Sequence, residues 1–276
     1  MSVTIIERGG GKTDNASGPT GKLKKKTVRS DAMADVPVVI LAGGKGTRLR
    51  PFTACLPKPL VPVGDMPILE VVLRQLADQG FQNVTLSLGH MSELIQAYLG
   101  TTSWGNIELE ISTVDEEAPS GTAGSLSRVQ GLDGTFMAMN GDVLTNLDYA
   151  DLVQSHKASG ALLTIAAHNK ELRIDLGVLE ADGQGRLTGY IEKPIQNFEV
   201  SMGVYVYNSE VLKFIEKDKY LDFPTLVQQL IECDEHVNIY QNDAFWLDIG
   251  RPEDFAQAQD IFEREPELFG IGGRGE

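Results

Sequence analysis

The stretch that decides the fold is VVILAGGKGTRLRP, which occupies residues 38–51. It opens with four apolar residues, three of them β-branched, and this pattern predicts a buried parallel strand. Glycines and cations follow, in the segment from Gly43 to Arg48. Glycine lets a backbone approach a ligand closely, and successive N–H groups in such a turn form a concavity that binds anions. The stretch therefore predicts a phosphate site at the end of the first strand.

Two familiar phosphate-binding motifs do not fit this turn. A P-loop needs lysine directly after its second glycine, whereas Gly46 is followed by Thr47. The dinucleotide fingerprint needs a third glycine at the position of Leu49, and a nicotinamide or methyl-donor enzyme is therefore not indicated. The segment at residues 11–13, Gly-Lys-Thr, lacks the leading glycine because position 6 is Ile6. The turn must belong to another class of phosphate site.

Composition narrows the class of protein. The 276 residues are 42% hydrophobic, which is ample for a core, and they contain no apolar run long enough to span a membrane. A net charge of −15 argues against nucleic-acid binding. The two cysteines, Cys55 and Cys233, form no disulfide framework and suit a reducing cytosol. We therefore expect a cytoplasmic protein whose cations are concentrated locally for an anionic ligand.

Strands alternate with helices from Pro37 onward. In the first half we expect strands at residues 38–41, 83–88, 107–113 and 136–139, helices at 66–80 and 92–99, and a loop at 120–126 that leads into a helix. Pro67 would lie in the first turn of one helix and Ser92 would cap the other. This rhythm predicts an α/β fold, a Rossmann-like doubly wound sheet that is mostly parallel. Ligands of such sheets bind beyond the carboxyl ends of the strands.

The second half is richer in strands. We expect them at residues 161–167, 177–180, 187–191, 200–207 and 245–248, with helices near Asn208, at 222–231 and from Pro252 onward. The first 36 residues show no period and carry seven Lys/Arg against four Asp/Glu, which predicts a disordered N-terminal extension over residues 1–36. One domain would span residues 37–262, and residues 263–276 would form a flexible C-terminal tail.

A longer pattern around the glycine turn resembles the signature of the sugar-phosphate nucleotidyltransferases, also called NDP-sugar pyrophosphorylases. The matching residues are Gly44, Gly46, Thr47, Arg48, Leu49, Pro51, Thr53, Pro57, Lys58 and Pro59. The segments at residues 49–53, 57–62 and 121–124 are most similar to the mannose-1-phosphate guanylyltransferase branch. Heptose-phosphate guanylyltransferases and sugar-phosphate uridylyltransferases share much of this pattern. The resemblance implies that residues 37–262 are a catalytic domain in which a strand-rich sugar-binding lobe packs on a nucleotide-binding lobe.

The implied reaction joins two polyanions. An oxygen of a sugar 1-phosphate attacks the α-phosphorus of a nucleoside triphosphate, with GTP favoured, and pyrophosphate leaves. The nucleophile is already an anion, so the reaction needs alignment and charge neutralisation rather than a general base. The resemblance assigns Arg48 and Lys58 to charge stabilisation. It assigns Mg2+ to Asp142 and Asp248, since this ion is usually held by one or two carboxylates and by phosphates.

The same resemblance assigns the substrate contacts. The nucleotide would be held by Leu41, Ala42, Gly43, Gly44, Gly46, Thr47, Arg48, Gly121 and Thr122, and the sugar phosphate by Gly177, Glu192, Lys193 and Ser201. Lys45 and Arg50 are secondary candidates for phosphate contacts, since each could equally be a solvated cation of the loop. Ser201 stands where the family often has asparagine, and this departure leaves the sugar open between a manno-configured hexose and a heptose.

Two alternatives stay open at this stage. The chain could transfer a uridylyl or thymidylyl group to another sugar 1-phosphate, or it could be a catalytically silent paralogue that senses nucleotide sugars. Asp142 and Asp248 could also be ordinary turn residues, since aspartates are common at strand ends. The expected partners are the triphosphate and the sugar 1-phosphate, without nucleic acid or membrane, and a homo-oligomer is compatible with the pattern.

Overall fold

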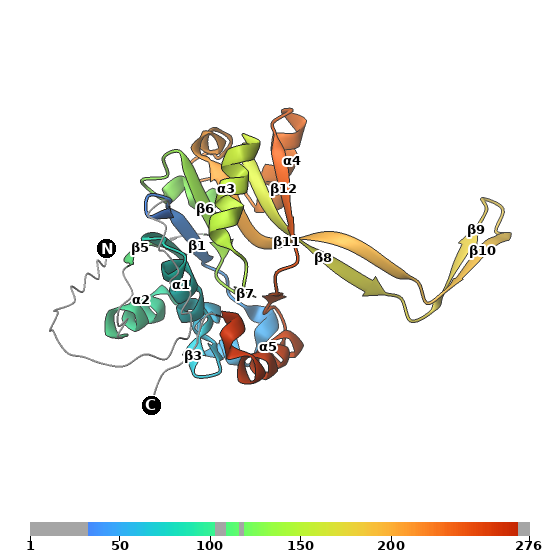
Figure 1. Cartoon of the computed structure of the whole chain (residues 1–276), viewed down its shortest axis with the longest axis horizontal. Helices are drawn as coiled ribbons and strands as arrows, with labels where there is room; N and C mark the ends of the chain where they lie inside the picture. Colours follow the sequence, from blue (N-terminus) through green and yellow to red (C-terminus); the bar gives the residue numbers. More distant parts are fainter. Residues whose placement is uncertain (1–32, 103–108, 116–118, 270–276) are drawn as a thin grey trace, which may run out of the picture.

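The structure is a computed structural model, and it describes residues 33–102, 109–115 and 119–269. A seven-stranded sheet forms its centre in the order β12-β8-β11-β6-β1-β4-β5 (Figure 1). The strands are β1 (Val38–Ala42), β4 (Asn83–Leu88), β5 (Glu110–Asp115), β6 (Thr135–Asn140), β8 (Leu163–Arg173), β11 (Ile195–Asn208) and β12 (Val237–Asn242). β11 runs antiparallel to both neighbours, and the other pairs are parallel. The predicted mostly parallel, mixed sheet is confirmed.

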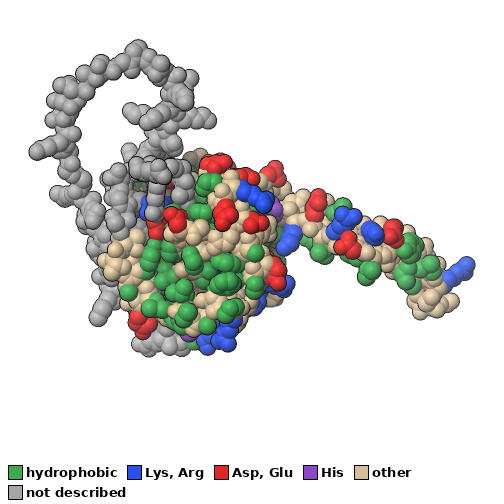
Figure 2. Space-filling model, turned by 90° about the horizontal axis from the view of Figure 1, so that it is seen from below, with side chains coloured by type: hydrophobic (Ala, Val, Ile, Leu, Met, Phe, Trp, Pro, Cys, Tyr) green, Lys and Arg blue, Asp and Glu red, His purple; other side chains and the backbone are tan. Residues whose placement is uncertain are grey.

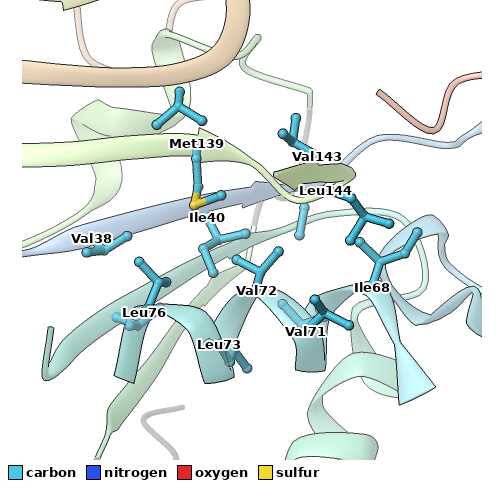
Figure 3. Packing of buried hydrophobic residues seen from close by; sticks show 14 of the residues in the cluster. Val38, Ile40, Ile68, Val71, Val72, Leu73, Leu76, Met139, Val143 and Leu144 are labelled. Carbon is cyan, nitrogen blue, oxygen red and sulfur yellow. The ribbon is translucent and has the colours of Figure 1, made fainter. Parts of the chain in front are cut away.

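Helices cover both faces of this sheet. They are α1 (Ile68–Asp78), α2 (Ser92–Thr101), α3 (Tyr149–Ser159), α4 (Phe223–Glu232) and α5 (Pro252–Arg264). Val38 and Ile40 belong to the core that contains α1 (Figure 3), whereas Val39 between them belongs to the core that contains α4. Because side chains alternate along a strand, β1 is buried on both faces, as in a doubly wound fold. Among the described residues, no helix is both long and apolar enough to cross a membrane.

Several local predictions need correction. Ser92 does not cap α2, because the N-cap residue is Met91 in the left-handed conformation with φ 59°. Pro67 is the N-cap of α1 rather than a residue of its first turn, and it pairs within a short hairpin of β2 (Pro62–Val63) and β3 (Met66–Pro67). The loop that contains Gly121 leads into a 3-10 turn, η5 (Gly124–Arg128), instead of an α-helix. Residues 107 and 108 of a predicted strand lie outside the described residues.

Among the larger elements, α3, β12 and β7 were not predicted. α3 begins at the N-cap Asp148, whose side chain accepts a hydrogen bond from Asp151 N at 2.8 Å, and it ends at Gly160 with φ 65°. β12 forms one edge of the sheet, and β7 (Val143–Thr145) pairs with β13 (Trp246–Asp248) in a separate two-stranded sheet. This last pairing matters for the site, since it joins segments 100 residues apart.

The packed part of the chain is wider than residues 37–262. Met33 and Val36 are buried, and Asn83 Nδ2 donates to the carbonyl of Ala34 at 2.9 Å. At the other end Phe269, in the 3-10 turn η7 (Pro266–Phe269), is buried and stacks on Phe262 with ring centroids 5.6 Å apart. The predicted boundaries at residues 36 and 262 are therefore too narrow, because apolar residues beyond them complete the core. Residues 1–32 and 270–276 lie outside the described residues.

Most of the strand-rich second half packs in the body, but one part of it projects. β8 and β11 continue beyond the sheet as a two-stranded ribbon, and a hairpin of β9 (Gly177–Ala181) and β10 (Leu187–Glu192) extends it away from the body (Figure 1). We call residues 169–199 the arm, and not one of them is buried. The register of the ribbon is unbroken from the pair Ser201/Ala167 to the pair Ile195/Arg173, so the strands carry the hairpin outward.

His156 predicts how the stability of the fold depends on pH. Its Nδ1 lies 2.8 Å from Thr164 Oγ1, and burial, followed by the nearby charge of Lys157, lowers its pKa to about 4. An unfolded histidine titrates near ~6.5, so the unfolded chain binds more protons between these values and stability falls as pH drops below ~6.5. We expect a loss on the order of 2 kcal/mol at pH 5 from this residue. Urea unfolding at pH 7.5 and 5.0 should show this loss in the wild type and a smaller one in His156→Gln; equal losses would contradict it.

Candidate active site

A cleft of about 580 Å3 opens at the carboxyl ends of β1, β4 and β6. We call it the main cleft. Of the predicted site residues it is lined by Leu41, Ala42, Gly43, Gly44, Lys58, Gly121, Thr122 and Asp142. Sequence reasoning did not assign Gly89, His90, Asn140, Tyr220 and Asp222, which also line it, and gave Lys45 only a secondary place. The parallel register explains the location, since Leu41 pairs with both Ser87 and Asn140 and the three strands end together.

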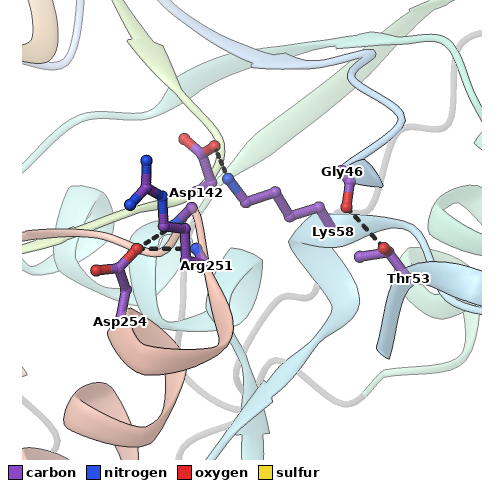
Figure 4. A network of polar contacts seen from close by, with 7 residues as sticks. Gly46, Thr53, Lys58, Asp142, Arg251 and Asp254 are labelled. Atoms are coloured by element: carbon purple, nitrogen blue, oxygen red, sulfur yellow. Dashed lines mark hydrogen bonds and ion pairs between the residues drawn. The ribbon is translucent and has the colours of Figure 1, made fainter. Parts of the chain in front are cut away.

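The glycine turn owes its shape to close backbone packing. Gly46 has φ 58°, and its carbonyl accepts a hydrogen bond from Thr53 Oγ1 at 2.7 Å (Figure 4). A Cβ at Gly46 would lie 3.2 Å from Lys58 Cβ, so the turn and the Pro-Lys-Pro segment need this glycine to pack together. Gly46 and Thr47 are therefore in the turn but not in the lining of the main cleft. Gly43 lines it, and a Cβ on Gly89 would lie 2.8 Å from the Gly43 carbonyl oxygen.

The opposite wall of the main cleft is held by hydrogen bonds to one carbonyl. Leu221 O accepts from the backbone N–H groups of Ala123 at 3.0 Å and Gly124 at 2.9 Å. Gly121 has φ +79°, and a Cβ there would lie 2.3 Å from the same oxygen. Thr122 Oγ1 accepts from the N–H of Phe223 at 2.9 Å. Gly121 and Thr122 therefore lie at the cleft as predicted, and they also fasten it to the start of α4.

Two carboxylates meet beside Lys58. Asp248 pairs with Val143 across β13 and β7, and Ile249 N donates to the carbonyl of Asp142 at 3.3 Å, so the pairing brings the predicted metal ligands together. Partial burial, and next the negative charge of Asp142, raise the pKa of Asp248. Asp142 Oδ2 forms an ion pair with Lys58 Nζ (Figure 4). Its other oxygen, Oδ1, is buried without a hydrogen-bond partner among the described residues.

This donor set suits a hard divalent cation. Asp142 and Asp248 supply carboxylate oxygens, and the unpartnered Asp142 Oδ1 is free to take a ligand. In the described part of the chain, no group of three or more His, Cys, Asp or Glu could hold a metal. A cation bound to these two carboxylates would complete its coordination with water or with substrate oxygens, which is how Mg2+ is commonly held.

A second cleft of about 550 Å3, which we call the side cleft, adjoins the main one and shares Thr122 and Asn140 with it. The register of β11 shifts between Ser201 and Tyr205, and Gly203 in this bulge has φ +76°. A Cβ at Gly203 would lie 2.7 Å from Asn140 Nδ2, so the glycine makes room for that amide. The predicted Ser201 lines the side cleft. The lining also includes Asp248 and Trp246 but, in the described part of the chain, no lysine or arginine.

Arg48 does not line either of these clefts. It is exposed and lines a polar cleft of about 490 Å3 together with Asp248, Lys170 and Arg251. Its positive charge lowers the pKa of Asp248, less strongly than burial and Asp142 raise it. The structure thus places Arg48 on the Asp248 side of the site rather than against the glycine turn.

Three predicted sugar-phosphate residues lie outside the clefts. Glu192 pairs with Gly177 at the base of the β9–β10 hairpin, and Lys193 follows with φ 45°. The ring of Tyr190 occupies the space beside Gly177, because a Cβ there would lie 2.2 Å from Tyr190 Oη. Tyr190 Oη donates to Glu192 Oε2 at 2.8 Å. The structure therefore does not bring these three residues to the clefts, since they lie on the arm.

The comparisons with known proteins agree with this geometry. Residues 37–265 match the family described as nucleotidyl transferase. The mannose-1-phosphate guanylyltransferase of Mycobacterium tuberculosis is 32% identical over 235 residues, which cover 82% of this chain and 64% of the relative. The UTP–glucose-1-phosphate uridylyltransferase of Synechocystis sp. is 30% identical over 254 residues, with 85% and 66% covered. The chain thus spans slightly less than two thirds of the length of these relatives.

Solved structures share the fold. The crystal structure of HddC from Yersinia pseudotuberculosis complexed with GMP-PN matches with a TM-score of 0.63 at 25% identity, covering 82% of this chain and 99% of that one. A second structure of the same Yersinia protein gives a TM-score of 0.64 at 26% identity.

The wall that contains Gly121 can be tested with a matched pair of glycines. Gly121 and Gly131 have φ of +79° and +76°, but a Cβ at Gly131 would meet nothing within 4 Å. Gly131→Ala should lose about 1 kcal/mol of stability from backbone strain alone. Gly121→Ala should lose roughly 3 kcal/mol, because the Leu221 carbonyl must also move. Urea unfolding measures both losses, and equal values would show that the wall does not depend on this close approach.

Proposed function

The chain belongs to the nucleotidyl transferase family, and we propose that it transfers a nucleotidyl group from a nucleoside triphosphate to a sugar 1-phosphate. The observation that carries this proposal is the meeting of the glycine turn, Lys58 and the Asp142–Asp248 pair in two connected clefts. The main cleft offers backbone and cations to a polyphosphate. The side cleft offers hydroxyl, amide and carboxylate groups to a sugar.

The chemical step needs little from side chains as acids or bases. A phosphate oxygen of the sugar 1-phosphate forms a bond to the α-phosphorus, while the bond from that phosphorus to the bridging oxygen breaks and pyrophosphate leaves. The attacking oxygen is an anion at neutral pH, so the protein must align the reactants and neutralise charge. Lys58 is buried at the junction of turn and carboxylates, and it would contact the α-phosphate. Arg48 would approach from the side of Asp248 as charge builds.

Asp142 and Asp248 would hold Mg2+. When bound, this ion supplies positive charge to the reacting phosphates, which lowers the cost of bringing two polyanions together. The unpartnered Asp142 Oδ1 and the repulsion between the two carboxylates support this assignment. Lys58 would hold Asp142 in place through its ion pair until the substrates arrive.

The favoured substrates are GTP and a manno-configured hexose or heptose 1-phosphate. Support comes from a relative named mannose-1-phosphate guanylyltransferase and from the Yersinia protein complexed with GMP-PN, which shares this fold. Because another relative is named a UTP–glucose-1-phosphate uridylyltransferase, UTP is the alternative nucleotide donor. The base would lie between Leu41–Gly43 and Gly121–Thr122, as the lining of the main cleft allows.

We expect pyrophosphate release with Mg2+ when the purified chain is tested across a grid of nucleoside triphosphates and sugar 1-phosphates. A single strong signal from GTP and a manno-configured sugar would establish both substrates. A strong signal from another pair would support the proposed reaction and change only the proposed substrates. Tight nucleotide-sugar binding without turnover in any pair would instead support a silent binding protein.

The carboxylate and the arginine are tested by substitution. Asp142→Asn and Arg48→Ala should each lower the rate of pyrophosphate release by ~100-fold or more, since each removes charge that the transition state needs. Asp260→Asn is the control, because Asp260 is an exposed residue of α5 with only a 3.9 Å ion pair to Arg264. Circular dichroism should show all three folded. A near-normal rate in either site variant would overturn its assignment.

A further inference from the structure

The arm exposes more apolar surface than an isolated element of a soluble protein ordinarily does. Eight of its large apolar side chains are between 46% and 74% exposed, with Leu176 at the upper end. Figure 2 shows hydrophobic side chains along the arm, which projects freely from the body. An isolated two-stranded ribbon is at best marginally stable in water and needs something to pack against. The apolar side chains of the arm therefore lack a surface to pack against.

The register shows that these side chains form continuous faces. Leu179 and Tyr190 are directly opposed across the hairpin, so they lie on one face. Further in, Phe198 pairs with Lys170 and Leu172 pairs with Gln196, which puts Leu172 and Phe198 on one face of the ribbon as diagonal neighbours. Burying such a face against a second protein surface removes apolar area from water, which drives association.

The side cleft, in turn, lacks positive charge. A sugar 1-phosphate is an anion, yet among the described residues no lysine or arginine lines this cleft. Lys58 and Lys45 line the main cleft, where a triphosphate would need them. The arm carries Lys193 next to Glu192, both exposed and neither in a cleft. Among the described residues, the side cleft thus lacks a cation, and Lys193 on the arm lines none of the clefts described above.

The arm cannot deliver these residues to the cleft of its own chain. Lys193 is eight residues from Ser201 along β11, which is roughly 25 Å of extended strand. The ribbon is paired without a register shift from Ser201/Ala167 to Ile195/Arg173, so it offers no hinge in between. A bend at Lys193 itself would move the hairpin tip but leave Lys193 where it is. Closure within one chain would require breaking this pairing.

We propose that the arm docks on a second copy of this chain and places Glu192 and Lys193 at that copy's side cleft, so that two chains complete each active site. In a two-fold symmetric dimer each copy gives its arm and receives one. The apolar faces of the arm would be buried against the partner's body, and Lys193 would neutralise the sugar phosphate there. The role of Lys193 rests on the proposed function, whereas the docking of the arm does not.

The molecular mass of the protein in solution tests whether the arm docks on a second copy. The chain has a mass of 30.0 kDa, and sedimentation equilibrium of the full-length wild type should give twice that value. Leu179→Lys puts a charge on the exposed apolar face and should raise the dimer dissociation constant at least ~10-fold. Leu94→Lys, at a 42% exposed leucine of α2, is the matched control and should leave it unchanged. A monomeric wild type, or a dimer unaffected by Leu179→Lys and by Phe198→Lys, would overturn the proposal.

The shared active site is tested by subunit complementation. Asp142→Asn and Lys193→Ala chains are co-expressed with different affinity tags, and the mixed dimer is isolated through both tags. Each parent dimer should be nearly inactive, whereas the mixed dimer has one complete site and should release pyrophosphate at about half the wild-type rate. The reciprocal dimer, wild type with the double variant Asp142→Asn/Lys193→Ala, should be nearly inactive.

The two dimers give opposite results if the arm serves its own chain. The dimer of Asp142→Asn with Lys193→Ala would then be inactive, and the dimer of wild type with the double variant would be half-active. This outcome would overturn the proposal. An active Lys193→Ala parent dimer would also overturn it. A wild type that releases no pyrophosphate with any substrate pair would refute the proposed function instead, and the dissociation of the dimer by Leu179→Lys would still decide whether the arm docks.

Discussion

The site depends on the ion pair between Lys58 and Asp142. The pairing of β7 with β13 brings Asp142 and Asp248 together where the clefts adjoin, and burial, followed by the negative charge of Asp142, raises the pKa of Asp248. Lys58 is buried at this point and offsets the repulsion. It is positioned there because the Pro-Lys-Pro segment packs on Gly46, which has no side chain to obstruct it. The glycine turn and the carboxylates are therefore two parts of one electrostatic arrangement.

The two clefts are built in different ways, and this difference suits different ligands. The main cleft is formed largely by backbone, where Gly89 approaches Gly43 and Gly121 approaches Leu221. Such walls present N–H groups and carbonyls at fixed positions, which favours a ligand of constant shape. The side cleft is formed by side chains around the bulge of β11. Its specificity can change by substitution without disturbing the turn, which fits a family whose members are named for different sugars and bases.

β11 connects the site to the arm. Its inner part pairs with β6 and shapes the side cleft through Gly203, and its outer part leaves the sheet to form the ribbon. Because the ribbon is continuous with the sheet, the arm points in a direction set by the same strand that sets the cleft. A partner held by the arm would thus be oriented with respect to the site.

The sequence by itself determined the features that depend on local pattern. The apolar run before the glycines predicts β1, and its alternation with helical segments predicts the doubly wound sheet. Asp142 and Asp248 were placed at strand ends by the resemblance, and β7–β13 pairing brings them together. Only the tertiary structure decided where Arg48, Tyr220 and the arm lie. These positions follow from pairing between distant segments and from an antiparallel register that continues past the sheet, and such non-local geometry leaves no periodic signal in the chain.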